Sequence, residues 1–355
     1  MTVVPFAMRR LFLLARGVTT DRDRPHLKRL AEIDDPEQFV WSVLPHAARS
    51  FAPSILLLPE PEARSAAVGY LYARMLDTYE DLSPTGEAGR VALREFVDRF
   101  ESSPPGPAPV IRAPRVEDRR DEVHLLLVDR HALVDDLFAT LDLSARTHIV
   151  RLVRDMAEGM IEFGTIFEEQ SGVLDGDAQV LDYCHHVIGV PAMFMIETVM
   201  GQSATEHRAD ALEVSELIQL ANITRDVEKD LLRGVAYHPL LRSHLGTDGR
   251  GDAERDVRIA RRDLMRLATR RAAAFRRLLA AAHLPRLSSA RAAAVMMMLF
   301  TDRHYRRCAA SVGMSTWSGP DGLLAMTLAA MPAVVSAQWA DRVLLRVERD
   351  LLATA

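Results

Sequence analysis

Apolar residues recur at intervals of three and four along most of this chain, with polar residues between them. That spacing places the apolar side chains on one face of an α-helix. The alternation of β-branched and polar residues that is typical of strands is nearly absent. The pattern therefore predicts an all-α protein. The predicted helices cover residues 59–82, 87–102, 120–142, 146–170, 178–201, 204–232, 252–282, 287–311 and 321–353.

Segments rich in proline and glycine separate these helices and bear on the domain organisation. Residues 102–118 contain four prolines within Ser103–Pro109 and are expected to form a surface loop, because such a run cannot continue a helix. Residues 1–35 form a predicted N-terminal extension. Its stretch 6–16 is expected to be either a docked helix or a basic amphipathic turn on a membrane surface. Acidic motifs lie on both sides of the loop, and one site that needs both favours a single domain over residues 1–355.

The first acidic motif is Asp77-Thr78-Tyr79-Glu80-Asp81. Tyr70, Arg74, Asp77 and Asp81 follow one another at steps of four, three and four, so they share one helix face. A phenol, a guanidinium and two carboxylates are therefore expected to face a common space. Taken alone, the stripe is equally compatible with a solvated surface that carries an Arg–Asp pair.

The second motif is a polar stripe that is flanked by cationic side chains on a predicted helix. The stripe consists of Gln219, Asn222, Asp226 and Asp230, and the cations are Arg225, Lys229 and Arg233. Carboxylate and amide oxygens are hard ligands that suit Mg²⁺, which commonly takes substrate phosphates and waters as its remaining ligands. Arginine binds phosphate oxygens through two parallel hydrogen bonds.

The two motifs together pose an electrostatic problem. Like charges four residues apart on a helix repel by roughly 0.2–0.5 kcal/mol even on a solvated surface. Burial in a cleft makes ionised carboxylates more costly unless cations neutralise them. If the two stripes face each other, divalent cations and a polyanion between them resolve the repulsion. The pair of motifs therefore predicts a magnesium–diphosphate site.

Bulk composition narrows the remaining classes. The 355 residues are 48% hydrophobic and 26% charged, which supports a substantial core rather than disorder. A net charge of −5 argues against a protein that binds duplex nucleic acid. Two cysteines, Cys184 and Cys308, fit a reducing compartment, so we expect a cytoplasmic protein, with or without membrane association. Lys28 and Lys229 are its two lysines, and no apolar run is long enough to span a membrane.

These motifs resemble those of the squalene/phytoene synthases, whose members join two prenyl diphosphates head to head, and they are most similar to the squalene synthase side of the family. The two aspartate-rich motifs of the family resemble Asp77–Asp81 and Asn222–Asp230. Further similar segments are Ala48-Arg49-Ser50-Phe51, Gly159-Met160-Ile161-Glu162-Phe163, Tyr183-Cys184-His185-His186-Val187-Ile188-Gly189, Arg233-Gly234-Val235-Ala236-Tyr237-His238-Pro239 and His304-Tyr305-Arg306-Arg307. The resemblance implies an isoprenoid-synthase-type helical bundle with a central active-site cavity.

The resemblance also implies roles for individual residues. The implied Mg²⁺ ligands are Asp77, Glu80, Asp81, Asn222, Asp226 and Asp230. The residues implied to bind the prenyl diphosphate are Arg49, Ser50, Phe51, Arg74, Gln219, Arg225, Arg233, Tyr237, Tyr305 and Ile188. Those placed at the reaction itself are Asp77, Asp81, Asp226, Asp230, Tyr183 and Tyr70. Loss of diphosphate leaves an allylic cation, which an apolar cavity must shield from water.

Departures from the family bear on the product. Ala48 stands where the family usually has serine, and Ile188 adds bulk where a small residue is usual. Pro191 is expected to kink its helix, because proline removes a backbone hydrogen bond. We expect head-to-head condensation of two prenyl diphosphates, with farnesyl favoured over geranylgeranyl, to a presqualene diphosphate, squalene-like or phytoene-like product. The alternatives are a terpene synthase that cyclises one prenyl diphosphate and a non-catalytic helical partner protein. Use of NADPH and oligomeric state stay open, since some family members use NADPH without a Gly-rich motif.

Overall fold

The computed structural model describes residues 13, 25–49 and 51–353, and 76% of these residues are helical. Within these residues there is no strand, and an isolated β-bridge pairs Val173 with Ala236. The all-α prediction is therefore confirmed. No helix in the described ranges is both long enough and apolar enough to cross a bilayer. Ser50 and nearly all of the stretch 6–16 lie outside the described residues, so what was predicted for them stays a prediction.

The chain divides into two compact units, residues 1–161 and 162–355. Helix α9 (Leu143–Glu169) begins in the first unit and ends in the second. Each unit has a core of its own, built around one of the two helices that carry an acidic motif. The single-domain assignment for residues 1–355 stays a prediction.

The first unit is built around α5. Besides the start of α9, its helices are α2 (Leu27–Ala31), α3 (Pro36–Ala47), α4 (Phe51–Leu57), α5 (Glu60–Leu82), α6 (Gly86–Asp98), the 3₁₀ turn η1 (Arg99–Glu101), α7 (Arg119–Asp129) and α8 (His131–Ala139). α5 contacts α3, α4, α6, α7 and α8. Leu71, Met75 and Leu76 on its inner face are completely buried. The more exposed side of the same helix carries the three carboxylates of the first acidic motif, Asp77, Glu80 and Asp81.

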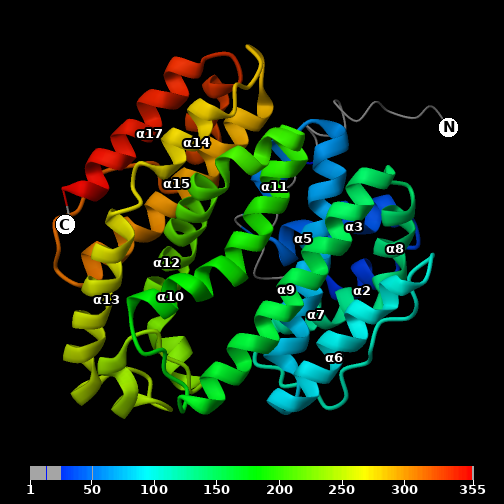
Figure 1. Ribbon diagram of the computed structural model, residues 1–355, viewed down its shortest axis with the longest axis horizontal. Coiled ribbons are helices and arrows are strands. Elements are labelled where there is room, and N and C mark those ends of the chain that lie inside the picture. The colour runs from blue at the N-terminus through cyan, green and yellow to red at the C-terminus, as the bar shows by residue number, and fades with distance from the viewer. Residues whose placement is uncertain (1–12, 14–24, 50, 354–355) are drawn as a thin grey trace. The chain divides into compact units, whose positions relative to one another are not determined.

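The second unit is built around α12. Its helices are α10 (Asp177–Cys184), the π-helical turn η2 (His185–Gly189), α11 (Val190–Met200), η3 (Gly201–His207), α12 (Arg208–Leu232), η4 (Pro239–His244), η5 (Gly251–Ala253), α13 (Glu254–Thr269), α14 (Ala274–Ala281), α15 (Ser289–Ser311), α16 (Leu323–Ala330), η6 (Met331–Val334) and α17 (Ala337–Leu352). α12 contacts α10, η2, α11, α13, α14 and α15 (Figure 1). The second acidic motif therefore also lies on the central helix of its unit.

Several predicted helices are interrupted. The predicted helix 120–142 is divided at Arg130 into α7 and α8, and the helix 252–282 is divided into α13 and α14. The helix 321–353 gives way to the 3₁₀ turn η6, in which Pro332 occupies the first turn. Proline has no N–H to donate, so the α-helical ladder cannot pass through it.

Among the described residues, the sequence analysis missed three helices, α2, α3 and α4. Residues Phe39–Ala47 are all buried, so this stretch has no polar face and shows no helical period. Pro45 lies inside α3, and α4 contains Pro53. Only the start of α3 carries an ordinary signal, because the Asp35 carboxylate accepts a hydrogen bond from the backbone N–H of Gln38 at 2.7 Å.

A π-helical turn separates α10 from α11 where a kink at Pro191 was expected. The turn covers His185–Gly189, and Pro191 occupies the first turn of α11. Pro191 cannot donate a hydrogen bond to the carbonyl of Val187, so the α-helical ladder is broken there and the wider π-turn is accommodated. The proline thus changes the register of the helix directly beside Ile188.

A buried ion pair lies in the core of the first unit. The side chains of Arg99 and Asp135 are 2% and 11% exposed and form a direct ion pair. Asp135 also accepts a hydrogen bond from the Tyr72 hydroxyl at 2.6 Å. Arg99 Nε donates to the carbonyl of Gly106 at 2.7 Å. One guanidinium therefore joins the helices and the irregular segment 102–118.

Candidate active site

In the first unit, α5 brings three of the predicted residues into direct contact. Arg74 Nη2 donates to the Tyr70 hydroxyl at 2.9 Å, and Arg74 Nη1 lies 2.8 Å from an oxygen of Asp77. The Arg74 guanidinium also lies 5.7 Å from the centre of the Tyr70 ring. The stripe predicted from the four-three-four spacing is therefore present. Glu80 and Asp81 are exposed at the end of the same helix.

The Asp77 carboxylate of this stripe is largely buried, which makes its negative charge costly. Its side chain is 25% exposed, and burial raises the pKa of its carboxyl to about 6, with Arg74 opposing the shift and Asp81 adding to it. One arginine therefore only partly compensates the buried charge. A further cation near Asp77 and Asp81 would relieve the remaining cost.

Three more residues border this stripe. Phe51, the first residue of α4, packs against Tyr70 with ring centres 5.6 Å apart. Arg49 is half-buried and has a left-handed backbone with φ of 45°. His124 on α7, which the sequence analysis missed, lies in the field of Arg74, Arg120 and Arg49. No sequence signal marks His124, since its place depends on the packing of α7 against α5.

His124 provides a pH-dependent test of this packing. Burial, followed by Arg74 and Arg120, lowers the pKa of His124 to about 3. The unfolded chain takes up the proton near pH 6.5, so it binds more protons than the folded protein as pH falls below that value. We expect His124→Gln to reduce the loss of unfolding free energy between pH 7 and pH 5 by about 1–2 kcal/mol. Urea titrations at the two pH values measure this, with the exposed His26→Gln as the control, and an unchanged loss would contradict it.

On α12 in the second unit, the residues of the predicted stripe and its flanking cations form two hydrogen-bonded pairs. Asn222 Nδ2 donates to Gln219 Oε1 at 3.1 Å, so the oxygen of Asn222 stays available. Arg225 Nε donates to Asp226 Oδ1 at 2.8 Å, and Arg225 Nη2 pairs with the other oxygen. Asp230 follows one turn later, half-buried. Arg233 ends the helix, and its backbone N–H donates to the carbonyl of Asp230 at 3.0 Å.

A second missed residue, His304 on α15, faces this stripe. Its Nε2 lies 3.4 Å from Arg225 Nη1. Burial, followed by Arg225 and Arg303, lowers the pKa of His304 to about 4, so the ring is neutral at physiological pH. A neutral ring nitrogen can accept the hydrogen bond from Arg225. His304 therefore orients the guanidinium that the sequence analysis assigned to phosphate.

Tyr183 and Tyr237 form an aromatic cluster in the second unit. Their hydroxyls are 3.1 Å apart and their ring centres 5.1 Å apart. Phe163 and Phe167 pack edge-on against Tyr183 at 5.2 and 5.9 Å. Gly172 packs directly against the loop that precedes Tyr237. Its φ is +86°, and a Cβ at this position would lie 2.1 Å from the carbonyl oxygen of Gly234, so no larger residue fits.

Tyr305 lies elsewhere in the second unit. Its side chain is completely buried, and its hydroxyl donates to the carbonyl of Leu217 at 2.6 Å. Burial raises the pKa of Tyr305 well above its ordinary value. Tyr305 therefore joins α15 to α12, because its hydroxyl is hydrogen-bonded to the backbone of α12. Ile188 lies half-buried in the π-turn.

The donor chemistry of both stripes fits Mg²⁺. In the described ranges, no three His, Cys, Asp or Glu side chains are arranged to hold a metal ion. Mg²⁺ is usually bound by one or two carboxylates together with substrate phosphates and waters, so it does not require a complete protein cage. The stripes supply hard oxygen donors, and Asp77 is a partly buried carboxylate whose charge is incompletely compensated. The set of Mg²⁺ ligands stays a prediction.

The all-α fold around α5 and α12 is shared with solved structures of synthases. TcSQS bound to BPH1237 matches with a TM-score of 0.63 at 16% identity, over 90% of this chain and 99% of that one. A dehydrosqualene synthase in complex with a ligand matches with a TM-score of 0.51 at 16% identity, over 89% and 98%. The chain belongs to the squalene/phytoene synthase family, whose sequence model matches residues 44–318. The members of this family are prenyltransferase enzymes.

Two curated relatives come from Botryococcus braunii. A squalene synthase is 29% identical over 205 residues, which are 54% of this chain and 40% of that protein. A second protein, Botryococcus squalene synthase, is 28% identical over 204 residues, again 54% and 40%. The matched part of this chain thus spans less than half the length of either relative.

Proposed function

We propose that this protein is a Mg²⁺-dependent prenyltransferase that condenses two prenyl diphosphates head to head, with farnesyl diphosphate as the favoured substrate. The observation that carries the proposal is the pair of oxygen-rich stripes on α5 and α12, each the central helix of its unit. Membership of the squalene/phytoene synthase family supports the reaction class. The raised pKa of Asp77, to about 6, supports a cation as part of the working site.

In this proposal each stripe contributes its own residues to diphosphate binding. Asp77 and Asp81 on α5 would hold Mg²⁺ through oxygen atoms, and Asn222, Asp226 and Asp230 on α12 would do the same. When bound, Mg²⁺ neutralises the negative charge that builds on the leaving diphosphate. Arg74 and Arg225 lie beside these carboxylates and would bind phosphate oxygens through their N–H groups. Tyr70 and His304 orient the two guanidinium groups.

The aromatic cluster around Tyr183 acts after diphosphate has been lost. Loss of diphosphate leaves an allylic cation, which aromatic faces stabilise and an apolar wall shields from water. Phe163, Phe167, Tyr183 and Tyr237 provide such faces in the second unit. The contact between the Tyr183 and Tyr237 hydroxyls provides a route for a proton.

The decisive experiment is a product analysis. Purified protein is incubated with Mg²⁺ and farnesyl or geranylgeranyl diphosphate, with and without NADPH, and the products are identified by mass. We expect diphosphate release and a C30 product from the C15 substrate. A C40 product only from the C20 substrate would correct the substrate. Absence of diphosphate release would overturn the proposal in favour of a non-catalytic helical partner protein.

Cyclisation of a single prenyl diphosphate is the second candidate function. The observation that favours it is the π-turn before Pro191, which carries the bulky Ile188 in a half-buried position. A bulkier wall leaves less room for a second prenyl chain. A C15 or C20 cyclic product in the same assay would select this alternative. Ile188→Ala should then increase any coupled product.

We also propose peripheral membrane contact through an apolar surface on α16 and η6. No charged residue occurs in residues 322–340. Four side chains that are 40–64% exposed follow one another at steps of four, three and four: Leu324, Leu328, Met331 and Val335. Leu287 lies beside them, because the N–H of Ser288 donates to the carbonyl of Val334 at 2.9 Å, and Arg286 next to it is exposed. An apolar stripe with a cationic neighbour suits an anionic lipid surface.

Vesicle flotation tests this contact. We expect the double variant Leu328→Gln/Val335→Gln to bind vesicles of phosphatidylcholine and phosphatidylglycerol about tenfold or more weakly, since both side chains are over half exposed. Leu143→Gln, which removes an exposed leucine in the first unit, is the matched control. Equal flotation of the two variants would contradict membrane contact at α16. Concentration-dependent dimerisation that the double variant abolishes would assign the surface to a second copy.

A further inference from the structure

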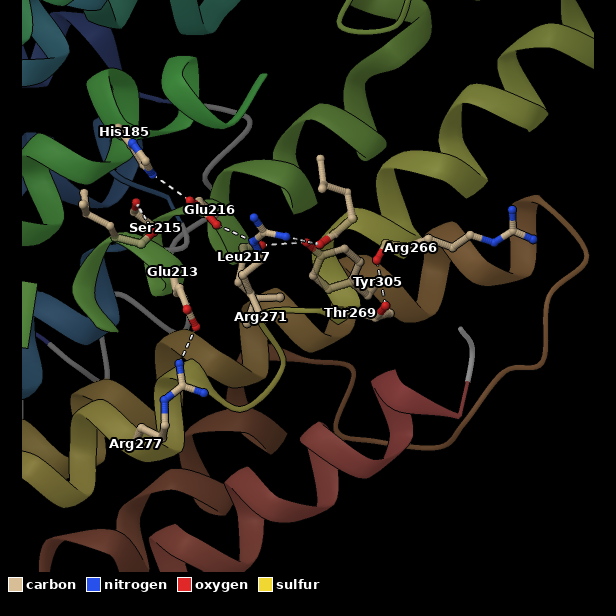
Figure 2. A network of polar contacts seen from close by, with 12 residues as sticks. His185, Glu213, Ser215, Glu216, Leu217, Arg266, Thr269, Arg271, Arg277 and Tyr305 are labelled. Atoms are coloured by element: carbon tan, nitrogen blue, oxygen red, sulfur yellow. Dashed lines mark hydrogen bonds and ion pairs between the residues drawn. The ribbon is translucent and has the colours of Figure 1, made fainter. Parts of the chain in front are cut away.

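Glu216 on α12 is a buried carboxylate whose two oxygens bind different elements (Figure 2). Oε1 lies 2.6 Å from Nε2 of His185, and Oε2 is hydrogen-bonded to Nε of Arg271. The Glu216 side chain is 7% exposed and that of Arg271 is 14% exposed. Burial acts to raise the pKa of Glu216, but the hydrogen bonds from His185 and Arg271 outweigh it, so the pKa is lowered. The group is therefore a fixed anion.

Arg271 is held as firmly as its partner. It lies in the bend between α13 and α14, and its Nη1 donates to the carbonyl of Leu267 at 3.0 Å. The guanidinium therefore faces Glu216 from a fixed position. Each carboxylate oxygen of Glu216 is thus bound to a partner on a different element, and this arrangement suits a residue that positions what it binds.

What Glu216 binds is the beginning of the π-turn. His185 is the first residue of the turn and Gly189 is the last. Gly189 packs so closely against α12 that a Cβ there would lie 3.2 Å from Leu212 Cδ2 and 3.3 Å from Ser215 Oγ. The turn is thus attached to α12 at both ends. Between the two attachments lie Val187 and Ile188, both half-buried.

We propose that Glu216 is a specificity-determining positioning residue, which, through His185, fixes the π-turn and with it the position of Ile188, the residue that the proposed function places against a prenyl chain. The proposal rests on the proposed prenyl-transfer function for its effect on products. It assigns Arg271 the task of holding the carboxylate in place. A π-turn is a local widening of the helix, so an attachment at its first residue holds the residues within it in place.

The test separates positioning from simple stability. Glu216→Leu and Arg271→Met each leave one charge buried without its partner, which is strongly destabilising. The double variant Glu216→Leu/Arg271→Met removes both charges, and apolar replacements of a buried pair are often well tolerated. We expect the double variant to regain most of the lost urea midpoint, yet still to lack the bond to His185. The ratio of coupled to cyclic product should remain changed by about threefold to tenfold relative to the wild-type protein. The KM for the prenyl diphosphate should change more than kcat.

Glu213→Gln provides the matched control. Glu213 lies on the same helix and pairs with Arg277 of α14, but both side chains are 43% exposed and neither touches the π-turn (Figure 2). We expect this variant to keep the wild-type product ratio and KM. Glu216→Gln should restore most of the wild-type ratio, because its amide can still bond to both partners. A double variant that regains stability and the wild-type products together would overturn the proposal.

Hydrogen–deuterium exchange tests the same inference without substrate. We expect the amides of residues 185–189 to exchange about tenfold or more faster in the double variant than in the wild-type protein or Glu213→Gln, as loss of a hydrogen bond to a charged group predicts. Unchanged exchange would overturn the inference, whatever the enzyme makes. If the expected difference in exchange is found but the wild-type protein consumes no prenyl diphosphate, only the proposed function would be overturned.

Discussion

Replacing Asp226 by asparagine is expected to lower the rate of diphosphate release by about 10²- to 10³-fold, the range found when one group that stabilises transition-state charge is removed. Asparagine keeps the shape of the side chain and one oxygen, but it removes the negative charge that would hold Mg²⁺. Arg225, which donates two hydrogen bonds to Asp226, keeps one acceptor. The helix and its packing should therefore survive. Release of diphosphate from farnesyl diphosphate, at several Mg²⁺ concentrations, measures the effect.

Asp210→Asn is the control for this substitution. Asp210 lies on the same helix, and its carboxylate also accepts a hydrogen bond from an arginine, Arg277, at 2.8 Å. The two carboxylates are comparably exposed, at 27% and 34%. We expect Asp210→Asn to retain near wild-type turnover. Equal losses in the two variants would mean that α12 tolerates no amide substitution, and unchanged turnover in Asp226→Asn would contradict the metal site.

The largest effect on stability is expected from Arg99→Leu. This substitution leaves the Asp135 carboxylate buried with a single hydrogen bond from Tyr72. Removing one partner of a buried pair typically costs about 3–5 kcal/mol. The irregular segment 102–118 should also become more accessible, since Arg99 Nε no longer binds the carbonyl of Gly106. Urea denaturation measures the first effect, and limited proteolysis within 102–118 measures the second.

Two variants calibrate that result. Arg120→Leu breaks an Arg–Asp pair with Asp118 in which both side chains are about 40% exposed, and exposed pairs contribute about 0–1 kcal/mol. Tyr72→Phe removes the remaining hydrogen bond to Asp135 and should cost about 1.5–3 kcal/mol. A loss for Arg99→Leu no greater than that for Arg120→Leu would show that water reaches the buried pair.

The fold was predictable where a helix has both a polar and an apolar face. α5 was predicted at 59–82 and lies at Glu60–Leu82, because its stripes are separate and prolines flank both ends. α3 escaped prediction because its inner turns are buried on every side, so polar and apolar faces do not alternate. The interruptions between α7 and α8 at Arg130, and between α13 and α14 at residues 270–273, could not be predicted from the sequence. The helices on both sides of each interruption are amphipathic, so the apolar pattern continues across it. Pro332 was a readable signal for the third break.

The site was predictable within each helix but not across helices. Spacing alone placed Tyr70, Arg74 and Asp77 together, because neighbours on a helix face follow from its period. His304 meets Arg225 across 79 residues of sequence, and Arg271 meets Glu216 across 55. No local pattern marks such partners. They become visible only when packing shows that a polar side chain, such as Glu216, lies inside.

The scarcity of lysine has a practical consequence. Each compact unit carries one lysine, Lys28 in the first and Lys229 in the second, and both are exposed. Lys229 lies on α12 between Asp226 and Asp230. An amine-directed label would therefore modify one side chain per unit besides the chain terminus. Protection of Lys229 by Mg²⁺ and diphosphate, read by peptide mass against Lys28 in the same molecule, would report occupancy of the α12 stripe without any turnover.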